Sequence, residues 1–385
     1  MLIINGKLLL PREFNYHDLR IENGRIKEIL PFRSGCQDEE IYDARGSIVI
    51  PGLIDLEVHG ACGYDMSDAC GEAYEAISNY LIRHGVTTYV GAIDSFSEEI
   101  LEEAYAAAGD WIRSDHFGAK MIGLNMRGPF LNPAAAGHHD RSALRRPDAA
   151  LFEKLQNLSG GKILAVNVSP ELEGAAEFIR AVSGKVHVAL SNSTADYETA
   201  RMAYAFRADW CGDILFDMPP LTALEPGLIG AAMDIARTAT LRYANASVIH
   251  PAMLRLVYKE FLNRLCLVSA MSAFTGLKPG RYEIEGHTVI HKAFAARYED
   301  GTDAGGVLAL DSCLQDVLGM GAVPEDLAYR SVTETPAKVL GIFDEVGSIE
   351  IGKRADLAIL DLHGYGVQAV IRDGILMYDE RKNFD

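Results

Sequence analysis

The chain has 385 residues, 49% of them hydrophobic, and its formal net charge at pH 7 is −18. This length and hydrophobic content allow one large barrel with an accessory domain, or two to three domains. The acidic balance argues against nucleic acid or an anionic membrane surface as the partner.

The cysteines and the N-terminal segment indicate a cytoplasmic protein. MLIINGKLLLP has no basic region and no small-residue cleavage site, so we do not interpret it as a signal peptide. No run of about 20 apolar residues occurs, so we expect no membrane span. The cysteines form no CxxC pair and favour reduced, partly buried thiols over a disulfide or zinc framework. They are Cys36, Cys62, Cys70, Cys211, Cys266 and Cys313.

Both ends of the chain are typical of short strands joined by turns. Near the N-terminus, Asn5-Gly6 and Asn23-Gly24 are strong hairpin signals, and Asp373-Gly374 is another near the C-terminus. We therefore expect residues 1–51 and 344–385 to pair into one small β-sandwich domain.

Between these ends, short apolar runs alternate with helical stretches. This alternation predicts a parallel sheet, and eight such strands predict a TIM-type (β/α)8 barrel over residues 52–343. The expected strands are 52–58, 87–94, 119–126, 162–168, 186–191, 213–218, 239–244 and 265–270. The expected helices are 71–84, 97–114, 149–157, 171–183, 194–206, 226–236 and 251–261, and residues 280–298 are again β-rich.

Five motifs in order along the barrel carry a family resemblance. They are PGLIDLEVHGACGYD (51–65), GLNMRGPFLNPAAAGHH (123–139), HVALSNSTADYETA (187–200), ILFDMPPLTALEPGLIGAAM (214–233) and LVSAMSAFTGLKPGRYEI (267–284). The first is similar to the PGxIDxHxHGxxGxD signature of amidohydrolases, and the second resembles GxHxEGPFLxxxxKGAH of the N-acetylglucosamine-6-phosphate deacetylases. With the similar last barrel segment and return to the β domain, the resemblance covers nearly the whole chain.

The resemblance implies a metal-dependent hydrolase of amides with its site at the carboxyl ends of the barrel strands. In the family a divalent cation activates water and polarises the acetyl carbonyl. One Glu and two His are the usual ligands, with a further HxH pair on the first strand of two-metal members. An Asp on the last barrel strand is the general base and acid.

Position by position, most of these chemical groups are replaced. The HxH pair aligns with Glu57 and His59, and the Glu ligand aligns with Arg127, whose guanidinium has no lone pair for a metal. The two His ligands align with Asn192 and Asp213.

The general base and the substrate contacts are replaced as well. The general-base position is Ala270, which can transfer no proton. The substrate-binding Asn and the phosphate-binding Arg align with Phe216 and Leu224, and the His that reaches across the family dimer aligns with Val248. Only the last His of KGAH is kept, as His139. These substitutions predict a degenerate site on a retained scaffold.

Arg127 has two interpretations. A lost cation leaves excess acidic charge at the barrel mouth, so Arg127 can take its place and pair with Glu57 or Asp213. Alternatively, Arg127 binds an anionic ligand, with His138 and His139 on the adjoining loop. Adjacent residues of an extended chain point to opposite sides, so we expect at most one of these two histidines to face the pocket.

A residual metal site is a further possibility. Glu57 and His59 point to the same side of a strand and could bind a metal weakly together with Asp213. We expect Asp55 to be a structural residue at the strand end. The other histidines are expected to be structural or exposed: His84, His187, His250, His287, His291 and His363.

Three functions compete. The first is a catalytically silent relative, a pseudoenzyme that binds a ligand or partner and, by the resemblance, forms the family's homodimer. The second is a hydrolase of altered chemistry that uses a non-standard site, with or without metal. The third is an ordinary deacetylase, against which Arg127 and Ala270 both argue. We expect no cofactor unless a residual zinc site survives, no nucleic-acid or membrane partner, and a small anionic or sugar-like ligand if one binds.

Overall fold

The computed structural model describes residues 1–11, 13–34, 40–242, 245, 247–284, 287–292 and 294–382. Cys36 lies outside these residues, and no disulfide joins the five described cysteines. No helix in the described part of the chain is long and apolar enough to cross a membrane.

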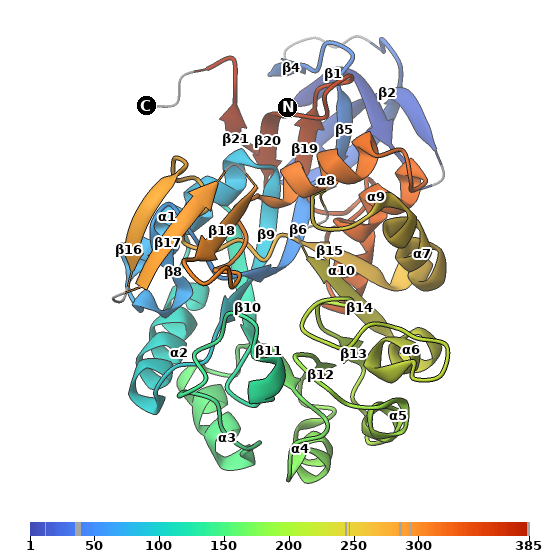
Figure 1. Ribbon diagram of the computed structural model, residues 1–385. Helices are drawn as coiled ribbons and strands as arrows, with labels where there is room; N and C mark the ends of the chain where they lie inside the picture. Colours follow the sequence, from blue (N-terminus) through green and yellow to red (C-terminus); the bar gives the residue numbers. More distant parts are fainter. Residues whose placement is uncertain are drawn as a thin grey trace.

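Eight parallel strands form the expected barrel, in chain order around the sheet (Figure 1). A parallel bridge between Val58 and Met271 brings its two edge strands together. The barrel strands are β6 (Leu53–Val58), β9 (Val86–Ile93), β10 (Lys120–Met126), β11 (Ile163–Val168), β12 (His187–Leu190), β13 (Trp210–Cys211), β14 (Thr238–Arg242) and β15 (Leu265–Val268).

Helices lie outside the strands in an outer ring, and several begin at a side-chain cap (Figure 1). Ser97, Asp148 and Asp196 each accept a hydrogen bond from a backbone N–H in the first turn, which satisfies a donor that the helix leaves open. The helices are α1 (Gly71–Arg83), α2 (Glu98–Arg113), α3 (Ala149–Leu158), α4 (Ala175–Val182), α5 (Tyr197–Ala205), α6 (Gly227–Ile235), α7 (Pro251–Phe261), α8 (Leu310–Gly319), α9 (Glu325–Ser331) and α10 (Glu334–Val339).

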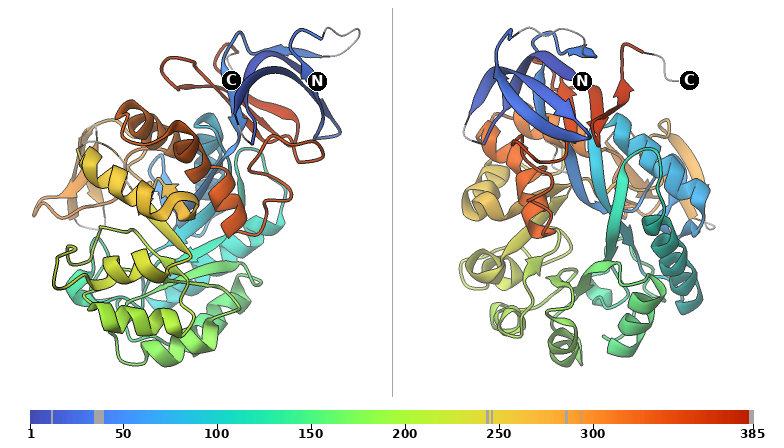
Figure 2. Two further views of the ribbon diagram at one scale, coloured as in Figure 1. Left: turned by 90° about the vertical axis from the view of Figure 1, so that its right-hand side faces the viewer. Right: turned by 180° about the vertical axis from the view of Figure 1, so that it is seen from behind.

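A second sheet joins strands from both ends of the chain and lies beside the barrel (Figure 2). Its order is β21-β20-β19-β5-β1-β2-β3, with β4 paired to β1. The strands are β1 (Leu2–Leu9), β2 (Phe14–Glu22), β3 (Arg25–Pro31), β4 (Ile41–Asp43), β5 (Ile48–Pro51), β19 (Leu357–Leu360), β20 (Val367–Arg372) and β21 (Ile375–Asp379). We propose residues 1–51 and 344–385 as the bounds of this unit.

Two smaller sheets form from segments that follow the first and last barrel strands. The expected β-rich stretch forms an antiparallel sheet of β16 (Gly280–Ile284), β17 (His287–Lys292) and β18 (Ala295–Tyr298). A short ribbon of β7 (Gly60–Ala61) and β8 (Tyr64–Asp65) follows the first barrel strand.

Two of the three hairpin predictions are confirmed. Asn23-Gly24 joins β2 to β3 and Asp373-Gly374 joins β20 to β21, with positive φ at all four residues. The prediction at Asn5-Gly6 is wrong, because β1 continues through it with a register shift against β2. Asn5 takes its positive φ inside the strand, so the same dipeptide makes an irregularity there instead of a turn.

The sixth barrel strand is also displaced from the prediction. It is Trp210–Cys211, whereas residues 213–218 form turns and bends. Asp213, Leu215 and Asp217 have φ between 49° and 78°, which an extended strand does not allow. The apolar residues of this segment therefore lie in a loop at the barrel mouth.

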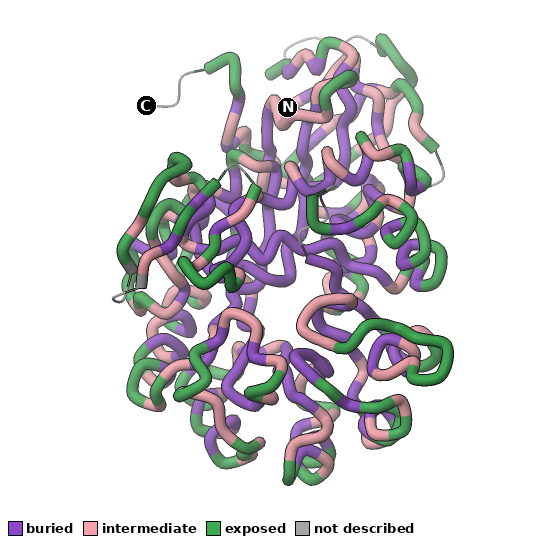
Figure 3. Tube along the Cα trace, in the orientation of Figure 1, coloured by how far each residue is buried: buried purple, intermediate pink, exposed green. Residues whose placement is uncertain are grey.

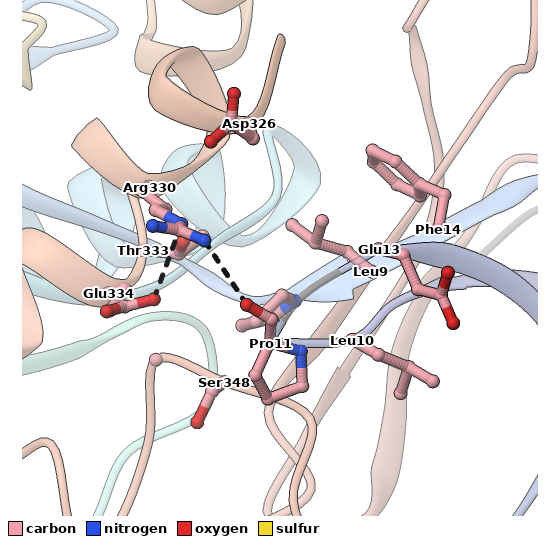
Figure 4. Close-up of a pocket in the computed structure, with 12 residues that line it drawn as sticks. Leu9, Leu10, Pro11, Glu13, Phe14, Asp326, Arg330, Thr333, Glu334 and Ser348 are labelled. Atoms are coloured by element: carbon pink, nitrogen blue, oxygen red, sulfur yellow. Dashed lines mark hydrogen bonds and ion pairs between the residues drawn. The ribbon is translucent and has the colours of Figure 1, made fainter.

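The buried residues concentrate in the strands of the barrel and of the second sheet (Figure 3). A cavity of about 60 Å³ lies where β1 and β2 approach α9 and α10, and Arg330 there donates to the Pro11 carbonyl and pairs with Glu334 (Figure 4). A second, open cavity of about 710 Å³ is lined near the start of β12 by His187 and Asp209. Neither cavity is lined by the polar cluster at the barrel mouth, so we locate the candidate site by its side chains.

Candidate functional site

Polar side chains gather at the carboxyl ends of the barrel strands. Glu57 lies on β6, Asn167 on β11 and Arg242 at the end of β14. Arg127 follows β10 directly, and Asp213 lies two residues beyond β13. All five side chains are buried. Parallel strands that close into a barrel bring their ends to one mouth, which is where TIM-barrel proteins bind and react.

Arg127 is at the centre of this group, with 0% of its surface exposed. Its Nη2 donates to Asp213 Oδ2 at 2.6 Å, and its Nη1 donates to Asn167 Oδ1 at 2.8 Å. Its Nε lies 3.3 Å from Glu57 Oε1. The pairing expected from the sequence is therefore confirmed with both carboxylates. Because both terminal nitrogens donate to acceptors of the protein and Nε lies within ion-pair distance of Glu57, this arrangement favours ion pairing over the binding of an anionic ligand.

Gly212 and Asn167 lie close against the guanidinium of Arg127. A Cβ on Gly212 would lie 2.9 Å from Asn167 Oδ1 and 3.3 Å from Arg127 Nη1. Asn167 is itself fixed, because its Nδ2 donates to Asn125 Oδ1 at 2.7 Å and its Oδ1 also accepts from Ser191. Because Gly212 has no side chain, its backbone can lie close to the guanidinium of Arg127.

The charges of this cluster hold one another in place. Burial disfavours the charge of Arg127, but Asp213 and Glu57 outweigh burial and raise its pKa further. Burial would raise the pKa of Glu57, yet Arg127 and His59 together lower it. Burial raises the pKa of Asp213, and the guanidinium 2.6 Å away opposes that shift. Removing one member would leave a buried charge without its partner.

Arg242 extends the cluster toward the loop after β13. Its Nη1 lies 3.4 Å from Asp213 Oδ2, and its Nη2 donates to Asp217 Oδ2 at 2.7 Å. Its guanidinium also lies 5.0 Å from the centre of the Phe216 ring. A cation over an aromatic face is attracted by the ring's electron density. Phe216 therefore packs against a charge of the protein itself.

A second cluster lies beside the first and is centred on Asp94. His59 Nδ1 is 3.0 Å and His138 Nε2 is 3.1 Å from the same oxygen, Asp94 Oδ2. His139 Nδ1 lies 3.7 Å from Asp94 Oδ1 and 3.1 Å from Ser95 Oγ. His59 Nε2 is 3.3 Å from Glu57 Oε1, so Glu57 touches both clusters.

The expectation that only one of His138 and His139 faces the pocket is wrong. It assumed an extended chain, but residues 137–139 form a turn. Both imidazoles reach the carboxylate of Asp94, and their rings stack with centroids 4.5 Å apart. The turn after β10 thus brings two consecutive histidines to one place.

The ionisation of the second cluster differs from one residue to the next. Burial would lower the pKa of His59, but Asp94 and Glu57 outweigh burial and raise it to about 10. Burial would raise the pKa of Asp94, yet the three histidines hold it well below its usual value. Burial lowers the pKa of His139 well below its usual value, so this ring is neutral at pH 7.

The backbone has an unusual conformation at three of the residues that the sequence singled out. Asn192, Asp213 and Ala270 each follow a barrel strand with φ between 46° and 49°. Residues with a Cβ rarely adopt this left-handed region, and such strain concentrates at functional sites. The main chain thus has a shape suited to presenting side chains at the mouth, although Ala270 presents only a methyl group.

Three further residues singled out from the sequence, Asn192, Leu224 and Val248, take no part in the ion pairs of the two clusters. Asn192 donates to the carbonyls of Ala135 and Ala136 and so ties down the loop after β10. Leu224 is 90% exposed and Val248 is 40% exposed. The exposure of Leu224 means that its side chain does not fill the barrel mouth.

The residues at the position where the resemblance implies a metal do not fit one. Metal ligands must offer a lone pair, and Arg127 offers none. The two carboxylates that could replace the usual ligands, Glu57 and Asp213, both face its guanidinium. The residual set expected from the sequence, Glu57 with His59 and Asp213, is therefore not the set that converges. In the described residues, the group that could hold a metal is His59, Asp94 and His138.

Asp94, Asn167, Asp217 and Arg242 belong to these clusters but were not singled out from the sequence. All four carry a recognisable signal, because each lies at or near the carboxyl end of an expected strand. That position alone marks a residue of a TIM-type barrel as a site candidate. For Asp217 the expected strand is 213–218, which the structure shows as a loop.

Comparisons with known proteins cover the barrel and the second sheet. The amidohydrolase family model matches residues 48–377. The chain is 29% identical to the N-acetylglucosamine-6-phosphate deacetylase of Bacillus subtilis, over 88% of this chain and 87% of that protein. It is 26% identical to the N-acetylgalactosamine-6-phosphate deacetylase of Escherichia coli O157:H7, over 97% and 98%.

Two solved structures share the fold. The N-acetylglucosamine-6-phosphate deacetylase from Pasteurella multocida superposes with a TM-score of 0.91 at 21% identity, covering 97% of this chain and 98% of that one. A mutant of the Mycobacterium smegmatis N-acetyl-D-glucosamine-6-phosphate deacetylase, in complex with N-acetyl-D-glucosamine-6-phosphate, gives 0.89 at 25% identity, covering 98% and 99%.

Proposed function

Because the chain belongs to the amidohydrolase family and resembles its N-acetylglucosamine-6-phosphate deacetylases, we propose that it retains their barrel without their efficient, metal-dependent deacetylation. The observation that carries this proposal is the buried guanidinium of Arg127 between Asp213 and Glu57. By the resemblance, this fixed positive charge would stand where the relatives hold a cation, which supports the proposal.

The other substitutions support the same proposal. Ala270 supplies no group to take a proton from water or give one to a leaving amine. Leu224 cannot pair with a phosphate, and its 90% exposure places it away from the buried cluster. The barrel fold is shared with the relatives and its mouth carries a polar network of its own, so the fold can still present a binding surface. We also propose, from the resemblance, that the chain forms a homodimer in the cytoplasm.

The test is a deacetylation assay of the purified full chain. N-acetylglucosamine 6-phosphate and N-acetylgalactosamine 6-phosphate are supplied with and without added zinc, and the Bacillus subtilis relative serves as the positive control. We expect kcat/KM at least about 1,000-fold below that of the relative, because the general base and the activated water are both lost. A value within about tenfold of the relative would overturn the proposal.

A second candidate is a hydrolase that uses a non-standard site, and the convergence of His59, His138 and His139 on Asp94 favours it. Burial keeps the His139 imidazole neutral, so its free lone pair can accept a proton or a hydrogen bond from a substrate or a water. This candidate predicts slow turnover of an amide or sugar phosphate that His139→Ala removes. The control is His187→Ala, which changes a histidine outside the mouth.

A further inference from the structure

The cluster at Asp94 has the geometry of a metal site. One nitrogen each of His59 and His138 lies 3.0 Å and 3.1 Å from Asp94 Oδ2. The three ligand atoms all lie within 4.8 Å of one another. Ligands about 2.1 Å from a tetrahedral ion are about 3.4 Å apart. Small movements of the side chains would therefore bring all three atoms to bonding distance of one ion.

The chain supplies these ligands from three separate elements. His59 directly follows β6, Asp94 directly follows β9, and His138 lies on the turn after β10. Two ligands thus come from neighbouring barrel strands, whose spacing the parallel ladder of β6 and β9 fixes. The third comes from a turn whose preceding segment is tied to Asn192 through the carbonyls of Ala135 and Ala136.

A second shell orients the first ligand. His59 Nε2 lies 3.3 Å from Glu57 Oε1, while its Nδ1 faces Asp94. A carboxylate on the far nitrogen of a metal-bound histidine fixes the ring and makes the other nitrogen a better ligand. Glu57 is held in turn by Arg127, 3.3 Å away. Arg127 therefore acts on both positions. It leaves no room for a metal between Glu57 and Asp213, and through Glu57 it helps to hold His59, a ligand of the proposed site.

Unpaired atoms of the same residues point to an additional group. Asp94 Oδ1, His138 Nδ1 and His139 Nε2 are buried without a hydrogen-bond partner among the described residues. Buried polar atoms are nearly always paired, so three such atoms in one cluster require an explanation. Asp94 Oδ1 belongs to the carboxylate whose Oδ2 faces His59 and His138, so a cation held there can bind this oxygen as well. The other two atoms, His138 Nδ1 and His139 Nε2, are not ligand atoms of that cation and do not bear on the proposal.

We propose that His59, Asp94 and His138 bind one divalent transition-metal ion, displaced from the position that Arg127 takes. Two imidazoles and one carboxylate match zinc best, and three protein ligands leave a coordination position open. His139, stacked on His138, lies beside the site without belonging to the ligand set. The proposal goes beyond the proposed function and does not depend on whether the chain deacetylates anything.

The test measures metal binding by the untagged full chain after treatment with a chelator. Zinc is titrated by calorimetry with elemental analysis of the product, and cobalt is titrated by its visible absorption, which reports the ligands and their geometry. We expect one metal per chain. His138→Ala and Asp94→Ala should each weaken binding about 100-fold or more. His138→Asp, which restores a ligand atom, should recover part of the loss.

His187→Ala is the matched control. His187 Nδ1 lies 2.7 Å from Asp209 Oδ2, so it is also a histidine paired with an aspartate, but outside the cluster. Its loss should leave the stoichiometry and affinity unchanged. If the unaltered chain binds no zinc or cobalt, the proposal is overturned, and hydrogen bonds alone join the histidines to Asp94. Binding that survives His138→Ala would overturn it too, and would place the ion elsewhere.

The two proposals fail in different ways. Stoichiometric metal that is lost in His138→Ala, together with measurable deacetylation, would contradict the proposed function and support the new site. If Asp94→Ala does not fold, His138→Ala alone decides the metal question, because His138 lies on a turn and not in a strand. Circular dichroism of each variant before titration verifies that the barrel is intact.

Discussion

Arg127 and Asp213 are joined by a hydrogen bond of 2.6 Å in which neither partner is more than 2% exposed. The pair links the end of β10 to the loop after β13 across the barrel mouth. Charged pairs this deeply buried are sensitive to the loss of one member, because the remaining charge has neither water nor a counter-charge. Stability measurements can therefore test the cluster independently of any activity.

Arg127→Met should lower the free energy of unfolding by about 3 kcal/mol, since Asp213 and Glu57 would lose their shared counter-charge and keep only Arg242 and His59 as cationic partners. Urea unfolding followed by circular dichroism measures the change. Arg146→Met is the control, because Arg146 pairs with Glu173 at a site where both side chains are at least 74% exposed. It should change stability by about 1 kcal/mol or less. Equal effects of the two substitutions would contradict the central role of Arg127.

The triple variant Arg127→Met, Glu57→Gln, Asp213→Asn should recover part of the stability lost in Arg127→Met. Removing all three charges leaves no isolated buried ion, which is the main cost of the single change. The same urea experiment compares the two variants. A triple variant less stable than Arg127→Met would show that packing, and not charge, dominates the effect.

Asp55 should make stability depend on pH. Burial raises its pKa from 3.8 to about 7, and its Oδ2 has no hydrogen-bond partner among the described residues. The folded state then binds the proton more tightly than the unfolded state, so the contribution of Asp55 is fully present below about pH 4 and is lost as the pH rises to about 7. The difference is on the order of 4 kcal/mol.

Asp55→Asn removes this titration. The difference in unfolding free energy between the variant and the unaltered chain should therefore shift in favour of the variant between about pH 4 and about pH 8. Urea unfolding at a series of pH values measures that difference, in which the other titrating groups cancel. A difference that does not vary with pH would show that Asp55 is ionised in the folded chain.

Gly374→Ala should destabilise the chain more than Gly46→Ala. Both glycines have positive φ, which costs a residue with a Cβ about 1–2 kcal/mol. At Gly374 the new Cβ would also lie 2.8 Å from Gly24 Cα, where two hairpin turns meet, whereas at Gly46 nothing lies within 4 Å. We expect Gly374→Ala to cost at least about 1 kcal/mol more in thermal or urea unfolding.

The sequence predicts the barrel well because every strand–helix unit repeats the same pattern of buried and exposed residues. The prediction of the sixth strand is wrong because residues 213–218 have the apolar composition of a buried strand. Their conformation is instead determined by contacts at the barrel mouth. Ile214 and Asp213, for example, donate their backbone N–H groups to Thr240 on the next strand. Local composition carries no information about such a contact.

The candidate site was predictable where a physical need links two residues. A buried arginine requires a carboxylate, so Arg127 indicated its partners Glu57 and Asp213 in advance. The cluster at Asp94 was not predictable in this way. His138 and His139 reach Asp94 only because the chain turns at residues 137–139, and the sequence was interpreted there as extended. A single turn thus determines which residues share a site.

The pairing of β5 with β19 has a consequence for how the protein forms. Val49 lies opposite Ile359, so a strand made early in synthesis finds its neighbour only after the whole barrel has been made. Until then the edge of β5 carries unpaired backbone groups, which can associate with other chains. Completion of the second sheet is therefore a late step that depends on a contact between distant parts of the chain.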